Sequence, residues 1–422
     1  MNNVLARFAF ISVGIFLVFM VGAAGADTLV QFNLNYSVNG SSGPVTSYLV
    51  QLFDQQAPIT VSNFLSYVTS LDYNGSMIHR DAHNYPNIYP YLSWDHFVVQ
   101  GGGYIPYVYN NQIYVDPIAS HGTITNEFSP TRSNVRGTIA MAKGDNPNSA
   151  TSEWFVNVVD NSSNLDNQNG GFTVFGQVVG EGMKLIDAVD NLQIYNYGGA
   201  FNQLPLKNNS LTMNNLIIVT SATVIPTIDW KGGSGSGPTN WDLAANWNPS
   251  TSAPNSPGSK ISFGNQTSNN VVNMVSANRT VGNLFFSATH STTIQSTTGK
   301  ILTLDNSGSP STIGVAGSHI ISAPVLLNND VNISGIGTLD LSGGVSGSHA
   351  MNVLGGEVTA SSIRVNTLCI GAGAKVVIQP RTGNGPQGGQ ITPIPEPSTI
   401  VSLCIGAISL LAYGLQRRKR AV

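Results

Sequence analysis

Apolar and polar side chains alternate along much of this chain. Residues 30–36 alternate strictly, and a period of two is typical of a half-buried β-strand. Residues 47–53, 137–141, 154–159 and 172–179 have a similar strand-like character. The pattern therefore predicts a first domain that is mainly β.

Two short segments depart from this alternation and carry a helical pattern. Pro58 suits the first turn of a helix, and the apolar residues that follow recur at i, i+3, i+4 and i+7, namely Val61, Phe64, Leu65 and Val68. Residues 182–192 form the second segment, whose expected inward-facing side chains are Met183, Ile186, Ala188 and Val189. Many strands with two short helices predict a β-barrel capped by helices.

The composition and residue pattern of the sequence change near residue 224. A Gly/Ser-rich stretch at residues 231–238 predicts a linker, bounded at 224–240. From 241 to 380, short alternating runs are separated by Gly, Asn, Asp or Ser at intervals of roughly ten residues. This texture is typical of a β-solenoid and also of a β-sandwich, and the sequence leaves both open. Residues 381–394 form a Gly/Pro/Gln-rich spacer.

Both ends of the chain carry targeting features. Arg7, the apolar run 8–21 and the small residues 24–26 predict a secretory signal peptide over residues 1–26, with a retained N-terminal anchor as the alternative. Residues 399–415 are apolar and long enough to span a bilayer. The basic cluster at 417–420 favours the cytoplasmic side for that end. These features predict an exported protein, anchored by a C-terminal transmembrane helix and facing the periplasm or the outside.

Composition narrows the possible partners and cofactors. The net charge is −3 and the pI is about 6.1, so nothing favours a nucleic-acid partner. Charged residues make up 9% of the chain, against roughly 25% in ordinary soluble domains, which is commoner in exported β-rich proteins. Cys369 and Cys404 are not expected to pair, and no Cys/His set has zinc spacing. His79 and His83 are four apart, but two nearby prolines argue against a helix there, so we expect no metal and no cofactor.

A series of short motifs follows in a fixed order within the first domain. They lie at residues 57–65 (APITVSNFL), 78–80 (IHR), 97–103 (FVVQGGG), 126–128 (NEF), 136–142 (RGTIAMA), 147–157 (PNSATSEWFVN), 165–166 (LD) and 172–178 (FTVFGQV). The set resembles the cyclophilin-type peptidyl-prolyl cis-trans isomerases, whose motifs occur in this order. The resemblance implies an eight-stranded closed β-barrel with two capping helices over residues 28–223, and isomerase activity on X–Pro bonds.

Rotation about an X–Pro bond needs no nucleophile and no metal. The barrier of about 18–20 kcal/mol comes from amide resonance, so the catalyst must hold the proline ring and stabilise the twisted amide. The resemblance implies that Arg80 is the catalytic cation. It also implies a set of substrate-binding residues, which are Phe97, Val98, Gln100, Ala142, Lys143, Glu153, Phe155, Leu165 and Phe172.

The chain departs from the family pattern at several of these places. Sixteen residues, 81–96, separate Arg80 from Phe97, and Tyr85, Tyr89 or Trp94 would gate the pocket if this excursion folded over it. Glu153 stands where the family has Gln, and we expect it to pair with Arg80 and compete with substrate. Three further replacements lie around the pocket, Lys143 for Asn, Asn164 for an aromatic residue and Phe172 for His or Tyr. Together they predict a slower or differently selective enzyme.

Three functional hypotheses follow. The first is an isomerase that assists folding of exported proteins by acting on their proline-containing segments. The alternative is a low-turnover protein of the cell surface or extracellular matrix that binds proline peptides. A third hypothesis is polysaccharide binding by Trp230, Trp241 and Trp247. The simpler alternative is that these are core or turn residues of a passive stalk.

Two further resemblances concern the second half of the chain. Pro395-Glu396-Pro397-Ser398, the apolar run and the Arg-rich tail resemble the PEP-CTERM sorting signal of Gram-negative, exopolysaccharide-producing bacteria, over residues 395–420. That implies recognition by an exosortase-type sorting enzyme, with release or transfer to the cell surface or matrix, and a plain tail anchor is the alternative. Residues 240–241, 246–248 and 302–308 resemble autotransporter-associated β-strand repeats.

Overall fold

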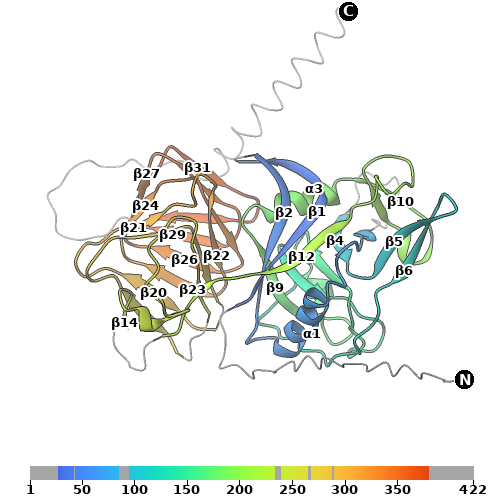
Figure 1. Cartoon of the computed structure of the whole chain (residues 1–422), viewed down its shortest axis with the longest axis horizontal. Helices are drawn as coiled ribbons and strands as arrows, with labels where there is room; N and C mark the ends of the chain where they lie inside the picture. Colours follow the sequence, from blue (N-terminus) through green and yellow to red (C-terminus); the bar gives the residue numbers. More distant parts are fainter. Residues whose placement is uncertain are drawn as a thin grey trace, which may run out of the picture. The chain divides into compact units, whose positions relative to one another are not determined.

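The computed structural model describes residues 27–41, 43–84, 95–232, 239–264, 268–287 and 289–379. They belong to one compact unit, in which an antiparallel sheet is followed by a parallel β-solenoid (Figure 1). The predicted signal peptide, most of the Gly/Ser-rich stretch, the spacer and the predicted C-terminal helix lie outside these residues. Within the described ranges no helix combines the length and the apolar character needed to cross a membrane.

The first part, residues 27–225, is here called the eight-stranded domain. Its sheet is antiparallel throughout, with the order β12-β1-β2-β9-β7-β8-β4-β3. Residues just before β3 also bond to the start of β12 and to the segment before it, because Val219 N donates to Ser76 O at 2.8 Å and Ile78 N donates to Ile217 O at 2.9 Å. The strands are β1 (Leu29–Gly40), β2 (Gly43–Leu52), β3 (Arg80–Asn84), β4 (Asp95–Gly101), β7 (Thr138–Met141), β8 (Trp154–Asn157), β9 (Val174–Val179) and β12 (Val219–Ile225).

Two helices lie at opposite ends of this sheet, as Figure 1 shows for α1 (Pro58–Thr69) and α3 (Gly182–Asp190). The stripe predicted for α1 is largely confirmed, since three of its four residues are buried and Leu65 is half-buried. In α3 the prediction is partly wrong, because Leu185 points inward while Met183 and Ala188 are only half-buried. The buried stripe of α3 runs at i, i+3, i+4 and i+7 from Gly182, and this spacing leaves 183 and 188 to the side.

The two faces of the sheet have different environments. On β8, Trp154 and Val156 belong to the main apolar core, whereas Phe155 belongs to a smaller cluster on the other face. On β4, Val99 belongs to the main core and Val98 to the smaller cluster. Successive residues of a strand point to opposite faces, so burial of Trp154 and Val99 inside the domain directs Phe155 and Val98 outward, where the candidate site lies.

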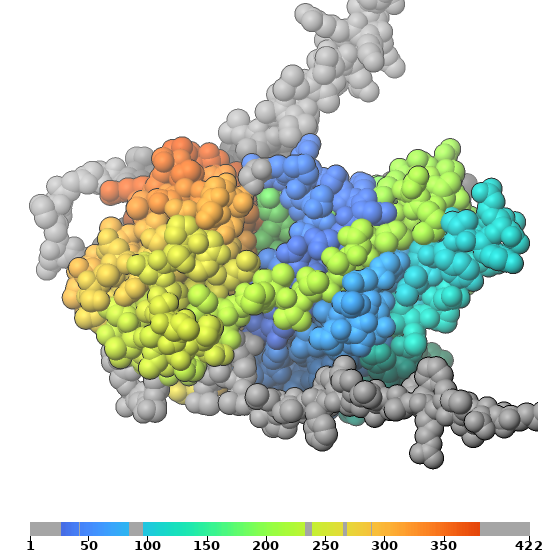
Figure 2. Space-filling model, viewed as in Figure 1, coloured from blue at the N-terminus to red at the C-terminus, as the bar shows by residue number. Residues whose placement is uncertain are grey.

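Several smaller elements complete the domain. The hairpin of β5 (Tyr104–Tyr109) and β6 (Gln112–Pro117) carries exposed tyrosines and stands away from the body of the domain, in cyan in Figure 2. A second hairpin pairs β10 (Gln193–Tyr195) with β11 (Leu204–Leu206), with the short helix η1 (Gly199–Phe201) between them. The one-turn helix α2 (Ser162–Leu165) follows β8 and supplies Leu165 to the pocket described below.

The second part of the chain is a β-solenoid, so the sandwich alternative is wrong. Three sheets run along it, parallel except for one antiparallel pair at the start of the first. Equivalent residues of successive coils stack on one another, as Ile313 does on Ile333 and Ile333 on Val353. These stacked side chains form one continuous apolar core. The first sheet contains β13 (Ile228–Trp230), β15 (Trp247–Asn248), β16 (Lys260–Phe263), β19 (Asn283–Phe286), β22 (Ser311–Val315), β25 (Val331–Gly335), β28 (Ala350–Val353) and β31 (Thr367–Ile370).

The other two sheets repeat this stacking. One contains β14 (Thr239–Asn240), β17 (Asn270–Asn273), β20 (Thr292–Gln295), β23 (Ser318–Ile321), β26 (Thr338–Leu341), β29 (Glu357–Ala360) and β32 (Lys375–Ile378). The other contains β18 (Arg279–Val281), β21 (Leu302–Leu304), β24 (Val325–Leu327), β27 (Val345–Gly347) and β30 (Ile363–Arg364). A short helix, η2 (Ala244–Asn246), precedes β15. The solenoid therefore begins with β13, within the segment predicted to be a linker.

The three tryptophans near the start of the solenoid are core residues. Trp230, Trp241 and Trp247 are fully buried and pack against Phe263. Trp247 Nε1 donates to Trp241 O at 2.8 Å, and Trp241 Nε1 donates to Pro254 O at 3.0 Å. Side chains held in this way present no ring to a sugar, so the hypothesis that they bind polysaccharide is wrong.

Candidate active site

Arg80 begins β3, directly opposite Gln100 on β4. Its side chain is half-buried, and its Nη1 donates to Gln100 Oε1 at 3.4 Å. Burial lowers the pKa of Arg80, while the negative charge of Glu153 acts in the opposite direction. A guanidinium keeps its proton at neutral pH even so, and Arg80 is therefore a fixed cation at the edge of the outer face.

An apolar cavity of about 260 Å³ opens beside this cation. Its walls come from β4, from β8 and from the loops that follow β7 and α2. The rings of Phe155 and Phe172 meet edge to face with centroids 5.8 Å apart. The structure brings together nine of the ten residues predicted for the site, which are Arg80, Phe97, Val98, Gln100, Ala142, Lys143, Phe155, Leu165 and Phe172.

Two polar residues complete the rim of this cavity, Asn164 and Gln168. Sequence comparison marked Asn164 as the replacement for an aromatic residue. Gln168 was missed, because it lies in an irregular loop after α2 where no periodic pattern indicates which side chains face the cavity.

Glu153 does not pair with Arg80, so that expectation is wrong. Among the described residues no ion pair joins the two side chains. Instead Gln100 Nε2 donates to Glu153 Oε2 at 2.6 Å, and His79 Nε2 lies 3.4 Å from the same oxygen. The carboxylate thus holds the far end of the Gln100 amide and turns its oxygen toward Arg80.

The surroundings of Glu153 favour its ionised form. Burial alone raises the pKa of Glu153, but the hydrogen bonds from His79 and Gln100 and the charge of Arg80 outweigh burial and leave the pKa below its ordinary value. Glu153 also lines a second cavity of about 220 Å³, together with His79, Arg80, Gln100, Gly199, Ala200 and Asn202. Arg80 and Gln100 therefore line both cavities, of which the first contains the aromatic residues of the pocket and the second contains Glu153 and His79.

Lys143 supports the pocket wall. Its Nζ donates to Asn169 O at 2.8 Å and to Gly171 O at 2.6 Å, and it lies 4.9 Å from the centroid of the Phe172 ring. Burial lowers the pKa of Lys143. The lysine thereby fixes the loop that ends at Phe172, and an ammonium near an aromatic ring adds a modest attraction.

The segment between Arg80 and Phe97 is partly strand. Residues 81–84 extend β3 and residues 95–96 begin β4, and His83 pairs with His96 across the two strands. The predicted sixteen-residue excursion is therefore shorter than expected. Its central part, with Tyr85, Tyr89 and Trp94, lies outside the described residues, and so does the predicted gating role.

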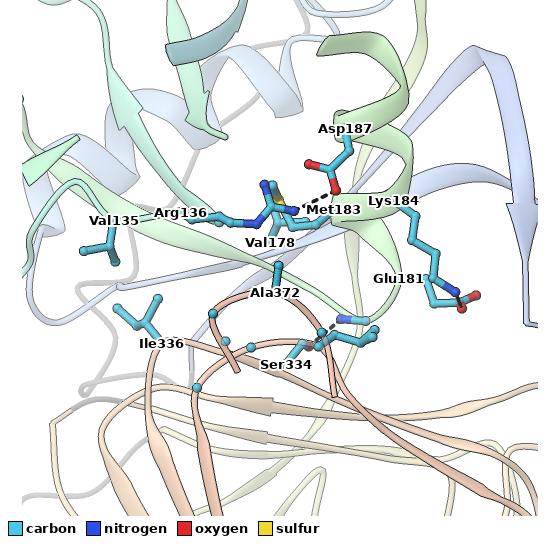
Figure 3. A pocket seen from close by; sticks show the side chains of 18 of the residues that line it. Val135, Arg136, Val178, Glu181, Met183, Lys184, Asp187, Ser334, Ile336 and Ala372 are labelled. Atoms are coloured by element: carbon cyan, nitrogen blue, oxygen red, sulfur yellow. Dashed lines mark hydrogen bonds and ion pairs between the residues drawn. The ribbon is translucent and has the colours of Figure 1, made fainter. Parts of the chain in front are cut away.

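A larger cavity of about 530 Å³ lies away from this site, between α3 and three solenoid coils (Figure 3). Its wall includes glycines and small apolar groups, such as Gly355 and Ala372. Arg136 Nη2 is held 2.6 Å from Asp187 Oδ2, and Lys184 pairs with Glu181. Because these charged groups are already satisfied by one another, the cavity offers no obvious chemistry despite its size.

The first half of the chain is similar to known proteins of one family. The model of the family "Cyclophilin type peptidyl-prolyl cis-trans isomerase/CLD" matches residues 38–215. A peptidyl-prolyl cis-trans isomerase of Acinetobacter baylyi is 34% identical over 174 residues, covering 41% of this chain and 77% of the relative. Peptidyl-prolyl cis-trans isomerase B of Escherichia coli is 35% identical over 145 residues, covering 33% of this chain and 76% of the relative. A crystal structure of a cyclophilin type isomerase from Cryptosporidium parvum aligns with 48% of this chain and 99% of its own, at 17% identity and a TM-score of 0.31.

Proposed function

Because the chain belongs to the family of cyclophilin-type peptidyl-prolyl cis-trans isomerases, and is an isomerase of that class, we propose that it works by apolar capture of proline beside Arg80. The observation that carries this mechanism is the position of Arg80. It lines both the cavity formed by Phe97, Phe155 and Phe172 and the cavity that Glu153 and His79 line. A proline ring in the first cavity places the preceding amide next to the guanidinium.

The catalytic effect follows from the charge that appears during rotation. The planar amide delocalises its nitrogen lone pair, and the twisted amide does not, so the nitrogen becomes a hydrogen-bond acceptor only near the transition state. A guanidinium that donates to this nitrogen stabilises the twisted form more than the planar one, which is the requirement for catalysis. The hydrogen bond to Gln100 uses Nη1 of Arg80 and leaves the other N–H donors of the guanidinium for the substrate.

One observation favours a second function, a proline-peptide-binding protein with little turnover. The carboxylate of Glu153 lowers the positive potential around Arg80. This reduces what Arg80 contributes in the transition state, while the apolar cavity that binds proline is left intact.

The substrates and location belong to the same proposal. The predicted signal peptide and the PEP-CTERM-like segment support export, handling by an exosortase-type sorting enzyme, and a final place on the membrane or the cell surface. The substrates would then be proline-containing segments of other exported proteins, either during folding or in a surface layer.

The test is isomerisation of a proline peptide by the purified chain and by Arg80→Ala. We expect kcat/KM to fall by about 10²–10³, the usual effect of removing one such donor. Arg136→Ala is the control, since its guanidinium pairs with Asp187 outside the pocket, and it should keep wild-type activity. Nuclear magnetic resonance exchange spectroscopy on the same peptide reports binding and turnover together. Binding without exchange by the wild-type chain supports the second function, and equal rates for wild type and Arg80→Ala contradict the role of Arg80.

A further inference from the structure

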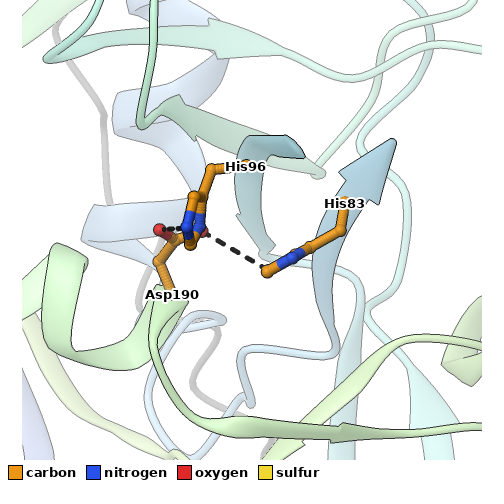
Figure 4. A group of neighbouring side chains, drawn as sticks. All are labelled: His83, His96 and Asp190. Carbon is orange, nitrogen blue, oxygen red and sulfur yellow. Dashed lines mark ion pairs between the residues drawn. The ribbon is translucent and has the colours of Figure 1, made fainter. Parts of the chain in front are cut away.

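Three side chains converge behind the candidate site, His83 on β3, His96 on β4 and Asp190 at the end of α3 (Figure 4). One ligand atom from each lies within 4.8 Å of those from the other two. His96 Nδ1 is 2.7 Å from Asp190 Oδ2, and His83 Nε2 is 3.6 Å from Asp190 Oδ1. The two imidazole rings have centroids 4.9 Å apart.

A second carboxylate, that of Asp81, lies beside this group. Its Oδ2 is 3.1 Å from His83 Nε2, and its side chain has no exposed surface. Asp190 is 6% exposed, and its carboxyl group is close enough to that of Asp81 to share a hydrogen bond. Two buried carboxylates in contact are costly unless a cation or a shared proton compensates their charge.

The backbone that carries these side chains is held from outside the sheet. Asp81 N donates to Gln203 O at 2.8 Å, and Gln203 Nε2 donates to His83 O at 2.9 Å. His83 is only 8% exposed, whereas His96 is 41% exposed. The His83–His96–Asp190 group is thus fixed on one side and exposed to solvent at His96. An ion from solution would reach the group from that side.

We propose that His83, His96 and Asp190 bind a divalent transition-metal ion, with Zn²⁺ as the ion that fits best. Two imidazole nitrogens and a carboxylate oxygen are ligands that Zn²⁺ accepts at about 2.0–2.2 Å. Ligands at that distance in a tetrahedron are about 3.3–3.5 Å apart. Atoms as far apart as 4.8 Å would therefore move together by about 1.4 Å, and the 2.7 Å pair of His96 and Asp190 would open slightly. Three protein ligands leave one position for water, and the charge of the ion offsets both carboxylates.

The proposed metal site is separate from the isomerase chemistry. Side chains alternate along β3, so Asp81 and His83 point away from the face that Arg80 uses. On β4 a bulge at Phe97 shifts the register, so that His96 pairs with His83 and shares its face. The ion would join β3, β4 and α3 beside the pocket without touching substrate. The proposal does not depend on the proposed function.

The experiment is a calorimetric titration of the purified, EDTA-treated chain with ZnCl₂ at pH 7.5. Cys369 is an exposed thiol that also binds zinc, so all variants carry Cys369→Ser. We expect one Zn²⁺ per chain, and a loss of affinity of at least about tenfold in His96→Ala and in Asp190→Asn. His349→Ala is the matched control, because it removes a partly exposed histidine 3.6 Å from an aspartate in the solenoid, and it should bind as the parent does.

Each outcome decides for or against the site. Circular dichroism in EDTA verifies that the variants are folded, and His96→Ala removes little buried surface. Loss of binding in both His96→Ala and Asp190→Asn, with His349→Ala unchanged, supports the proposal. Absence of binding by the parent overturns it. So does binding that survives Asp190→Asn, because the ion would then be held by surface imidazoles.

Discussion

The eight-stranded domain and the solenoid are both built from β-strands around an apolar core, but they use their polar side chains differently. In the solenoid, like residues of successive coils satisfy one another, as Asn352 Nδ2 does when it donates to Asn332 Oδ1 at 2.9 Å. In the eight-stranded domain, unlike residues from separate elements converge, as Arg80, Gln100 and Glu153 do.

The difference follows from the two topologies. Parallel coils place equivalent positions side by side, so a polar residue often meets another of its own kind. An antiparallel sheet with helices and loops brings together residues far apart in the sequence, and therefore cations, carboxylates and apolar walls. Among the described residues, the two clusters that carry the proposals both lie before residue 226.

The largest expected effect concerns the separate cores of the two regions. Trp247→Ala should destabilise the solenoid by about 3–5 kcal/mol, because it removes a fully buried indole that packs on Trp230, Trp241 and Phe263. Isomerase activity should persist at low urea concentration, because Trp247 lies in the solenoid core, and only Ala316 and Ile336 of the solenoid reach the smaller cluster that holds Phe155. Urea unfolding followed by circular dichroism, with activity measured along the same series, tests this expectation.

Trp154→Ala is the matched variant for that experiment. It removes an equally buried indole from the core of the eight-stranded domain, next to Phe155 on β8, and should abolish activity while the solenoid stays folded. If activity and solenoid structure are lost together in both variants, the two regions unfold as one cooperative unit and do not differ in stability.

How far the sequence predicted the fold depends on the range of the interactions. Alternation and the apolar stripe of α1 are local patterns, and they located the strands and that helix. The choice between solenoid and sandwich was not local, since it rests on residues 20 apart stacking in register, as Ile313 and Ile333 do. The inward position of Leu185 depended on the sheet beneath α3 in the same way.

The second prediction concerns Asp54, at the junction of the two regions. Thr28 donates to both of its carboxylate oxygens at 2.8 Å. Burial raises the pKa of Asp54 to about 6, and the carboxylate of Asp229 adds to the shift. Asp27 lies close by, donors from Gln51 and Ser287 reach it, and burial and Asp54 raise its pKa well above the ordinary value.

The sign of the pH effect follows from the raised pKa of Asp54. The native state binds this proton more tightly than the unfolded state, so the stabilisation is fully present below about pH 4 and is lost as pH rises through about 6. Between pH 5 and 7 we expect the free energy of unfolding to fall by about 1 kcal/mol more in the wild type than in Asp54→Asn. Urea titrations at both pH values measure the difference. The exposed Asp116→Asn serves as control, and an unchanged pH slope in Asp54→Asn would exclude this role.

The residues of the candidate site were predicted, but the hydrogen bonds between them were not. Family motifs identified nine of the residues that line the pocket, because each motif carries its own position in the fold. The predicted ion pair between Arg80 and Glu153 was wrong, because the sequence does not indicate that Gln100 lies between them. The cluster of His83, His96 and Asp190 was invisible for a similar reason, because its members are up to 107 residues apart and meet only where α3 ends against β3 and β4.

The smallest effect is expected at Glu153 itself. Glu153→Gln keeps an oxygen that accepts the hydrogen bond from Gln100 Nε2, so the orientation of Gln100 toward Arg80 is preserved, and only the negative charge is removed. The positive potential at Arg80 then rises, and kcat/KM for a proline peptide should increase about two- to fivefold, which corresponds to about 0.4–1 kcal/mol of screened Coulomb energy. Glu357→Gln, which breaks a pair with Lys375 on the next solenoid coil, should leave activity unchanged. A loss of activity in Glu153→Gln would mean that the charge itself orders Gln100, and that the carboxylate assists Arg80 rather than opposing it.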